Sequence, residues 1–154
     1  MDVLIGGFTL IKQANSRQCW YASASMVCRY RGKPDPPAPS DDADDSSWPL
    51  SALDVLVRSF GFTAIDKEIL KHPGFDAETF GRLLFRVACP LVCMGEYRPG
   101  APGAGHMVMV YRVTNTTVYY ADPFEPQLKA MDFPVFNRKL FKEMDPSCMM
   151  WLPK

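Results

Sequence analysis

The chain has 154 residues, of which 47% are hydrophobic, and its 17 basic residues balance 17 acidic ones. This length predicts one domain spanning residues 1–154 with a buried core, and the hydrophobic content excludes wholesale disorder. The zero net charge and the lack of a basic block argue against nucleic acid or an anionic membrane as the main partner. No apolar stretch approaches the roughly 20 residues that a membrane helix needs.

The N-terminal sequence lacks the positive charge and the apolar stretch of a secretory signal. The five cysteines are odd in number and form no dense framework, which favours reduced thiols. We therefore expect either a cytoplasmic protein or one that reaches the cytosol of a target cell by a route without a signal peptide. A start so close to Gln13 is also compatible with a domain cut from a longer polypeptide.

In chain order, residues 8–11 are apolar and predict a strand or an extended lead-in. Small and apolar residues after Cys19 predict a helix that runs to about Tyr30, before a glycine and a proline. Residues 33–49 are rich in proline and aspartate, so we expect an exposed loop there, either a spacer or a segment that contacts substrate.

Further helices and strands follow the loop. A helix with an apolar side is predicted over residues 51–59, and a second one over 77–87 with Asp76 as its N-cap. The remaining predictions are strands over 90–94, 107–113, 117–121 and 148–152, and a short helix over 133–141. Helices come first and an antiparallel sheet second, which indicates an α+β fold.

Four residues in this order carry the groups that acyl transfer by a thiol requires. Cys19 stands at the predicted helix start, where free N–H groups favour a thiolate, and Gln13 lies six residues before it. His106 begins a strand, and Asp122 ends the next strand 16 residues later. These residues supply a nucleophile, an oxyanion donor, a base and a carboxylate that orients the base.

Each of these residues has a structural alternative. A cysteine on an apolar helix is usually a small core residue, an isolated histidine is often a hydrogen-bonded edge residue, and Asp122-Pro123 alone is an ordinary turn. The other histidine, His72, lies in a sequence typical of a turn. Cys89 and Cys93 have no second Cys/His pair that would complete a zinc site. The ordered set of four residues, rather than any one of them, favours catalysis.

A shared function for His106 and Asp122 constrains the hairpin between them. Side chains alternate between the faces of a strand, so the two share a face only if paired residue numbers sum to an even number. A two-residue turn at 115–116 gives an odd sum and separates them. A three-residue loop over 114–116 pairs Val108 with Asp122 and makes His106 a diagonal neighbour. We therefore predict the longer loop or a β-bulge.

These motifs resemble the active-site motifs of papain-like cysteine peptidases. The chain is similar to the compact bacterial types, which trim bacteriocin leaders or are delivered as effectors into other cells. The resemblance spans Gln13 to Pro123, and three short motifs within it are specific. It implies a papain-like fold, with an N-terminal catalytic helix packed on an antiparallel sheet. It also implies Cys19 as the nucleophile, His106 as the base, Asp122 as the orienting carboxylate and Gln13 as the oxyanion donor.

The chain departs from the leader-trimming domains and from papain at a few positions. Leader-trimming domains have Asp-Cys-Gly where this chain has Gln18-Cys19-Trp20. The Cys-Trp pair is similar to papain and to the effector branch, whereas Asp122 stands where papain has an asparagine.

The resemblance implies a cysteine endopeptidase that acts on a protein substrate without a cofactor or metal. We expect an effector or toxin domain with a cytosolic target, and an inhibitor or immunity protein could accompany it. Three alternatives remain open. The same groups serve isopeptide cleavage, glutamine deamidation or leader processing, the fold can persist as a catalytically silent binding module, and the domain can be half of a toxin–inhibitor pair.

Overall fold

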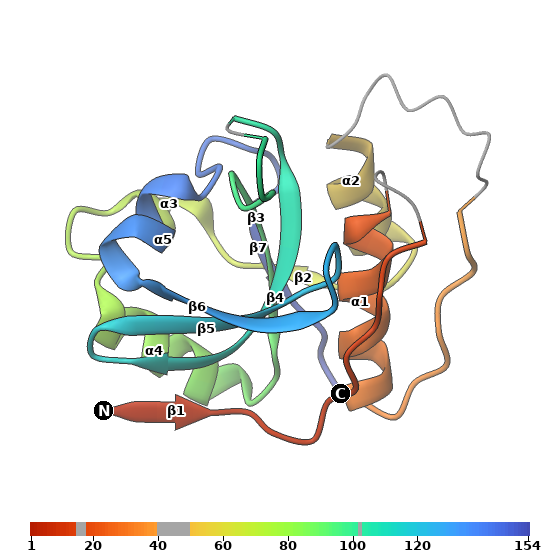
Figure 1. Ribbon diagram of the computed structural model, residues 1–154, viewed down its shortest axis with the longest axis horizontal. Coiled ribbons are helices and arrows are strands. Elements are labelled where there is room, and N and C mark those ends of the chain that lie inside the picture. Colours follow the sequence, from red (N-terminus) through yellow and green to blue (C-terminus); the bar gives the residue numbers. More distant parts are fainter. Residues whose placement is uncertain (15–17, 40–49, 102) are drawn as a thin grey trace.

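The computed structural model describes residues 1–14, 18–39, 50–101 and 103–154, which form an antiparallel sheet with helices packed around it (Figure 1). The predicted α+β class, with the N-terminal helix against the sheet, is confirmed. The described helices are α1 (Cys19–Tyr30), α2 (Leu50–Arg58), α3 (Lys67–Lys71), α4 (Ala77–Val87) and α5 (Phe133–Lys139). The described strands are β1 (Asp2–Leu4), β2 (Thr63–Ala64), β3 (Leu91–Gly95), β4 (His106–Thr114), β5 (Thr117–Asp122), β6 (Gln127–Asp132) and β7 (Met149–Trp151).

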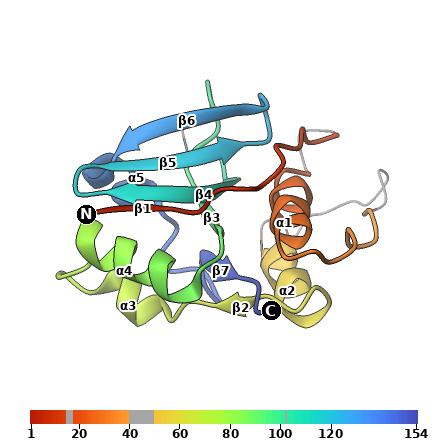
Figure 2. The ribbon, with the colours of Figure 1, turned by 90° about the horizontal axis from the view of Figure 1, so that it is seen from below.

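Strand β4 is the centre of the sheet. The strands follow the order β2-β7-β3-β4-β5-β6, and β1 pairs with β4 outside this path. One edge of β4 pairs with β3 through residues 106–110 and with β1 through residues 112–114, while its other edge pairs with β5. Figure 2 shows β1 lying beside β4, with β5 and β6 beyond it. His106 is therefore the first residue of the most extensively paired strand.

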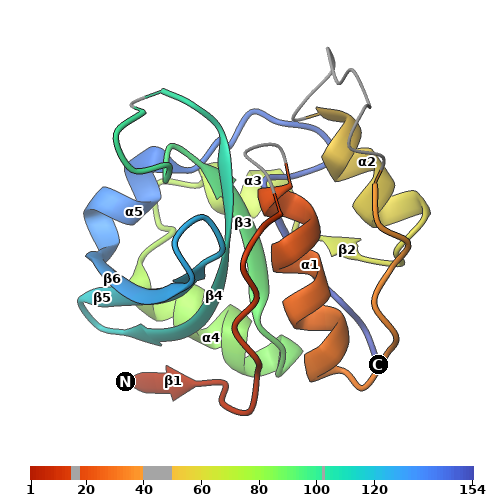
Figure 3. The ribbon, with the colours of Figure 1, turned by 45° about the vertical axis from the view of Figure 1, so that its right-hand side comes forward.

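The helices pack against different parts of the sheet. Helix α1 contacts β3 and β4, α4 contacts β1 and β4, and α5 contacts β5 and β6. Figures 1 and 3 show α1 and α5 on opposite sides of β4. A cluster of aromatic rings joins α4 to α5. It consists of Phe75, Phe80, Phe133 and Phe136, and the centroids of neighbouring rings lie 5.7–6.3 Å apart. None of the helices in the described part of the chain is long and apolar enough to cross a membrane.

Most predicted elements agree with the structure to within two residues. Helix α1 has the predicted bounds, and Asp76 caps α4 by accepting a hydrogen bond from the backbone N–H of Thr79 at 2.8 Å. Helix α5 ends at Lys139 rather than at residue 141. Leu140 already has extended backbone and bridges to Gly95.

Other predictions were wrong or missed an element. The N-terminal strand lies at Asp2–Leu4 and not at residues 8–11, which carry no regular structure. Strand β6 was not predicted because it is an edge strand with mostly exposed residues, and its apolar residues do not alternate regularly with polar ones. Helix α3 and β2 are too short to give a periodic signal.

The proline- and aspartate-rich segment is only partly within the described residues. Residues 33–39 form no helix or strand and are mostly exposed, as predicted for a loop. Residues 40–49 lie outside the described part of the chain.

The β4–β5 hairpin contains the predicted bulge. Near the turn, Val113 pairs with Val118, so the paired residue numbers sum to an odd number, as expected for a two-residue turn. The register then shifts at Tyr111. Beyond the shift, Val110 pairs with Tyr120, and the paired residue numbers sum to an even number. The extra residue therefore moves His106 and Asp122 to the same face of the hairpin.

The N-terminal segment closes over this bulge. The backbone N–H of Ile5 donates to the carbonyl of Tyr111 at 2.8 Å, so the bulged residue does not lose its backbone partner. The ring of Phe8 then lies 4.8 Å from the ring of Tyr111. Residues 5–8 thus hold the bulge in place from outside the hairpin.

We expect Phe8→Ala to lower the free energy of unfolding by about 1–3 kcal/mol, because it removes a half-buried ring and its contact with Tyr111. The matched control is Phe85→Ala, since the Phe85 side chain is 74% exposed and its loss should change stability by less than about 0.5 kcal/mol. Urea unfolding of both variants measures the difference. Equal stabilities would show that Phe8 does not support the bulge.

Candidate active site

Two hydrogen bonds join helix α1 to the second residue of strand β4, Met107. The backbone N–H of Met107 donates to Sγ of Cys19 at 3.4 Å, and Oγ of Ser23 donates to the carbonyl of Met107 at 3.2 Å. Cys19 and Ser23 are four residues apart and so lie on the same side of the helix. The thiol is therefore held beside the residue that follows His106.

Small residues allow this close approach. Ala22, Ser23, Ala24 and Ser25 are all buried, and Ala24 and Ser23 are completely so. A larger side chain at these positions would push α1 away from the main chain of β4. The role of Ser23 was not predicted, although its spacing from Cys19 on one helix side was a usable signal.

His106 and Asp122 are in direct contact. Nε2 of His106 lies 2.7 Å from Oδ1 of Asp122, and both side chains are almost wholly buried, at 2% and 0% exposure. Extending the β4–β5 register places Val108 opposite Asp122, so His106 is its diagonal neighbour as predicted. With Nε2 engaged by the carboxylate, Nδ1 is the ring nitrogen that remains for a thiol.

Asp122 receives two further donors that the sequence did not reveal. The backbone N–H of Phe124 donates to Oδ1 at 2.9 Å, and Nζ of Lys129 donates to Oδ2 at 2.8 Å. Burial raises the pKa of Asp122, but the hydrogen bonds from His106, Lys129 and Phe124 outweigh it, so the net pKa is below its ordinary value. The carboxylate is therefore charged at neutral pH despite its burial.

The Phe124 contact follows from a local motif. An aspartate that accepts a hydrogen bond from the N–H two residues later forms an Asx turn, which suits Asp122-Pro123-Phe124. The ring of Phe124 stands edge-on to the imidazole at 6.2 Å between centroids. The guanidinium of Arg98 lies 5.2 Å from the centroid of the Phe124 ring. Phe124 thus contacts both the imidazole and a cation.

Burial works against the charged form of the thiol. It raises the pKa of Cys19 to about 11, while the backbone N–H groups of Met107, Trp20 and Cys19 itself lower it. Cys19 is only 1% exposed. A helix start alone therefore does not produce a thiolate here. Nucleophilic chemistry requires a neighbouring base, which makes the placement of His106 decisive.

Gln13 lies at the same end of the molecule. Its backbone N–H donates to the carbonyl of Pro123 at 2.9 Å, and the residue is 6% exposed. Pro123 directly follows Asp122, so the segment that leads to α1 is hydrogen-bonded to the turn after the carboxylate. Residues 15–17, which connect Gln13 to the helix start, are outside the described residues.

The residues that were expected to be structural lie elsewhere. His72 ends α3, and its Nδ1 accepts a hydrogen bond from the N–H of Gly74 at 2.8 Å, as expected of a turn. All five cysteines are free thiols, and all are buried. Trp20, next to Cys19, is buried and stacks on Phe60 at 5.9 Å between ring centroids.

A pocket of about 670 Å³ lies along the loop between α5 and β7, lined by residues 140–145. This loop adjoins the strand next to His106. The N–H of Phe141 donates to the carbonyl of Met94, and Gly95 pairs with both His106 and Leu140. A Cβ on Gly95 would lie 2.4 Å from the carbonyl oxygen of Lys139, so only glycine permits this approach.

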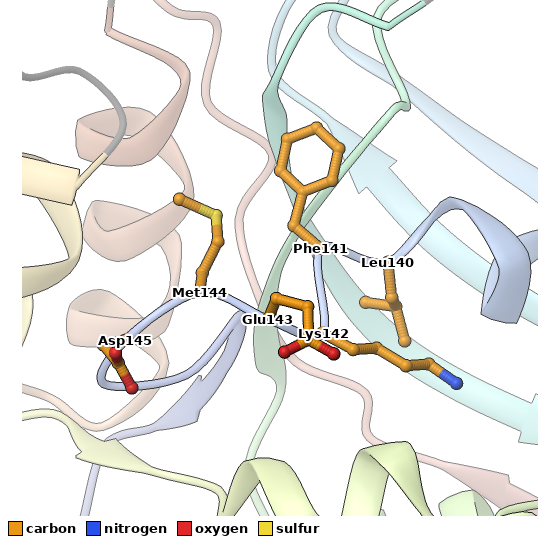
Figure 4. Close-up of a pocket in the computed structure, with 6 residues that line it drawn as sticks. All are labelled: Leu140, Phe141, Lys142, Glu143, Met144 and Asp145. Carbon is orange, nitrogen blue, oxygen red and sulfur yellow. The ribbon is translucent and has the colours of Figure 1, made fainter.

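Two apolar and two acidic side chains of this loop point to different sides. In Figure 4 Phe141 and Met144 point to one side, whereas Glu143 and Asp145 point to the other. The two carboxylates form ion pairs with α3: Lys71 with Glu143 at 3.1 Å and Lys67 with Asp145. Helix α3 is thus joined to the loop by two ion pairs.

The arrangement unites the four predicted residues from three parts of the chain. Cys19 contributes a thiol beside the start of β4, His106 an imidazole oriented by a buried carboxylate, and Gln13 an amide residue anchored to the turn after that carboxylate. No predicted site residue lies away from this group. These are the components of acyl transfer by an activated thiol.

Comparisons with known proteins agree with this chemistry. The family model described as Papain-like cysteine protease AvrRpt2, of the Peptidase C70 family, matches residues 7–141. Among solved structures, the crystal structure of a double glycine motif protease from an AMS/PCAT transporter in complex with the leader peptide is similar, with a TM-score of 0.54. Its sequence identity is 17%, over 99% of this chain and 95% of that chain, so this likeness concerns the fold. A comparison with curated proteins finds no match.

The predicted papain-like fold and the predicted class of enzyme are confirmed by these findings. The family model covers well over half of the chain and includes all four residues of the site. The chain belongs to the papain-like cysteine protease family of the AvrRpt2 type.

Proposed function

We propose that the chain is an endopeptidase that cleaves protein substrates through Cys19, His106 and Asp122, with Gln13 as an oxyanion donor. One observation carries the proposal: a buried His106–Asp122 hydrogen bond of 2.7 Å stands next to a main-chain N–H that contacts the Cys19 thiol. The family to which the chain belongs supports the same chemistry.

In the proposed mechanism, His106 accepts the thiol proton and Cys19 Sγ attacks the carbonyl carbon of the scissile bond. The oxyanion that forms is stabilised by the Gln13 amide and the N–H groups at the helix start. His106 then gives its proton to the leaving amine, which departs and leaves a thioester on Cys19. Water, deprotonated by His106, hydrolyses the thioester and restores the thiol.

Asp122 has an electrostatic role in this scheme. A carboxylate with a lowered pKa remains charged at neutral pH and stabilises the imidazolium that forms in each half-reaction. Its bond to Nε2 also fixes the tautomer and leaves Nδ1 for the thiol. This division of roles suits a thiol that burial would otherwise keep protonated.

We further propose that the enzyme works in a reducing cytosol as an effector or toxin domain, on a protein of the cell that it enters. Five free and buried thiols fit a reducing compartment, because oxidising conditions favour paired cysteines. A cognate immunity protein would protect the producing cell in this scheme. The neutral overall charge supports a protein substrate over a nucleic acid.

The function is tested with wild-type protein, Cys19→Ala and His106→Ala produced in a susceptible cytosol at equal levels. Only the wild type should generate new protein N-termini by mass spectrometry and impair growth. Cys28→Ala is the matched control because this cysteine is buried on the same helix away from the site, and it should behave as wild type.

The possible outcomes separate the alternatives. Toxicity that persists in Cys19→Ala would refute catalysis and indicate a binding module. Deamidated or isopeptide-cleaved products without new N-termini would refute peptide hydrolysis. A wild type that makes N-termini but harms no host would refute the toxin role and favour a processing peptidase.

Cys19 should be the most reactive thiol of the folded protein at neutral pH, by about tenfold or more, since only this thiol adjoins a histidine-bearing strand start. Iodoacetamide labelling followed by peptide mass spectrometry measures each site. Faster labelling of another cysteine would make the assignment of the nucleophile wrong. Burial raises the pKa of all five thiols: Cys19 to about 11, Cys148 to about 12, Cys93 well above its ordinary value, and Cys28 and Cys89 above theirs. The prediction therefore rests on the neighbouring His106 and not on a difference in thiol pKa.

Gln13→Ala should reduce kcat by a factor on the order of 10²–10³, because one oxyanion donor is lost. Alkylation of Cys19 should hardly change, since the thiol and its base remain. Rates with a cleaved substrate and with iodoacetamide, measured on the same preparation, test both statements. A parallel loss in both assays would show that the substitution only disturbs the helix start.

A further inference from the structure

The face of Asp122 opposite His106 is occupied by a lysine. Asp122 pairs with Gln127 on β6, and Tyr120 pairs with Lys129, so Lys129 is the diagonal neighbour of Asp122 on that strand. His106 holds the equivalent diagonal position on β4. The carboxylate therefore lies between His106 and Lys129, with Oδ1 bound to the imidazole and Oδ2 to Nζ of Lys129 at 2.8 Å.

We propose that Lys129 is a positioning residue of the active site, which holds the Asp122 carboxylate charged and aimed at His106. The inference rests on the proposed function of the triad. In this role Lys129 acts through Asp122 and does not need to contact the substrate.

The need for such a residue follows from burial. Asp122 is completely buried, and a buried carboxylate oxygen without a donor would be strongly destabilised or would take up a proton. The Phe124 N–H and His106 both bind Oδ1, whereas Nζ of Lys129 binds Oδ2. Loss of this contact would free the carboxyl to rotate, and a protonated carboxyl would no longer stabilise an imidazolium.

Lys129 is itself built into the sheet. Its side chain is 22% exposed, and it occupies an inward position of an edge strand whose alternate residues are exposed. Glu125 is the other carboxylate near Nζ, at 3.9 Å, and is half exposed. The shorter and more buried contact to Asp122 is the stronger one, because screening by water is weaker there.

A lysine on an edge strand has an ordinary explanation. Charged residues at such positions discourage pairing with other chains. That role requires a charge at the edge but no contact with a particular carboxylate, and it would not affect the titration of the site. The pH dependence of Cys19 reactivity therefore distinguishes the two roles.

The charged and titratable groups that act on Asp122 come from several elements. They are His106 on β4, Lys129 on β6, Cys19 on α1 and Tyr120 on β5 itself. Of these, Lys129 is the permanent cation at neutral pH. It lowers the pKa of Asp122, so its removal raises that pKa and the carboxylate is lost at a higher pH as the solution is acidified.

The test measures the rate of Cys19 alkylation by iodoacetamide between about pH 3 and pH 9, which needs no knowledge of the substrate. In Lys129→Met, the pH at which reactivity is half of its plateau should rise by about one unit. Lys129→Arg should restore the wild-type profile, since a pocket of about 330 Å³ beside Lys129 has room for the larger side chain.

Lys139→Met is the matched control. Lys139 lines the same pocket, but its Nζ bonds the carbonyl of Glu96 at 3.4 Å. This variant should keep the wild-type profile. Should Lys129→Met fail to fold by circular dichroism, Lys129→Gln retains an uncharged donor for Oδ2 and should shift the profile in the same direction.

A double-mutant cycle shows whether Lys129 acts through Asp122. In an Asp122→Asn background, Lys129→Met should cause little further change. An unchanged profile in folded Lys129→Met or Lys129→Gln, or an equal shift in both backgrounds, would overturn the role of Lys129 while leaving the triad intact. An ordinary thiol titration of Cys19 in the wild type would instead overturn the triad, and Lys129's role with it.

Discussion

One extra residue in β4 determines whether this site exists. Strand residues alternate in direction, and the two-residue turn of the β4–β5 hairpin would by itself put His106 and Asp122 on opposite faces. The register shift at Tyr111 changes the parity and brings them within 2.7 Å. A bulge costs a regular pair of ladder hydrogen bonds, so it needs support from another segment.

The N-terminal segment supplies that support and then continues to the nucleophile. Its residues pair with the end of β4, donate to the carbonyl of Tyr111 and place Phe8 on the Tyr111 ring. The same segment reaches Gln13, whose N–H is bound to Pro123. One stretch of chain thus links the bulge, the carboxylate turn and the approach to Cys19. The geometry of the site depends on this path as much as on the catalytic side chains.

The pKa values of Cys19 and Asp122, the two ends of the proposed triad, are shifted in opposite directions. The thiol is buried with only backbone donors, and its pKa is raised, so it depends on a base to react. The carboxylate is buried with three donors, one of them charged, and its pKa is lowered. In the proposed mechanism, the imidazole takes the thiol proton beside an anion that remains charged. Lys129 and the Phe124 N–H are for this reason part of the proposed site, although neither belongs to the triad.

Much of the arrangement could be predicted from sequence because it is encoded locally. The bounds of α1 follow from small and apolar residues between Cys19 and a glycine–proline stop, and the N-cap of α4 follows from Asp76. The two β-rich segments that begin with His106 and end with Asp122 were recognisable as strands. The requirement that these two side chains share a face led to the expectation of a bulge, without indicating the residue at which it would lie.

The amino-acid sequence by itself determined which groups are available and in what order, because short-range periodicity, caps and turn residues are read over a few positions. Tertiary structure decided the partners. Ser23 binds Met107, and Lys129 binds Asp122. The lack of a side chain at Gly95 lets the end of α5 approach β3 closely. Most of these contacts join residues that are distant in the chain. Strand β6, which carries Lys129, has little apolar alternation of its own and forms through backbone pairing with β5. Long-range pairing of this kind leaves no local pattern, so the buried donors to the carboxylate emerge only in the folded protein.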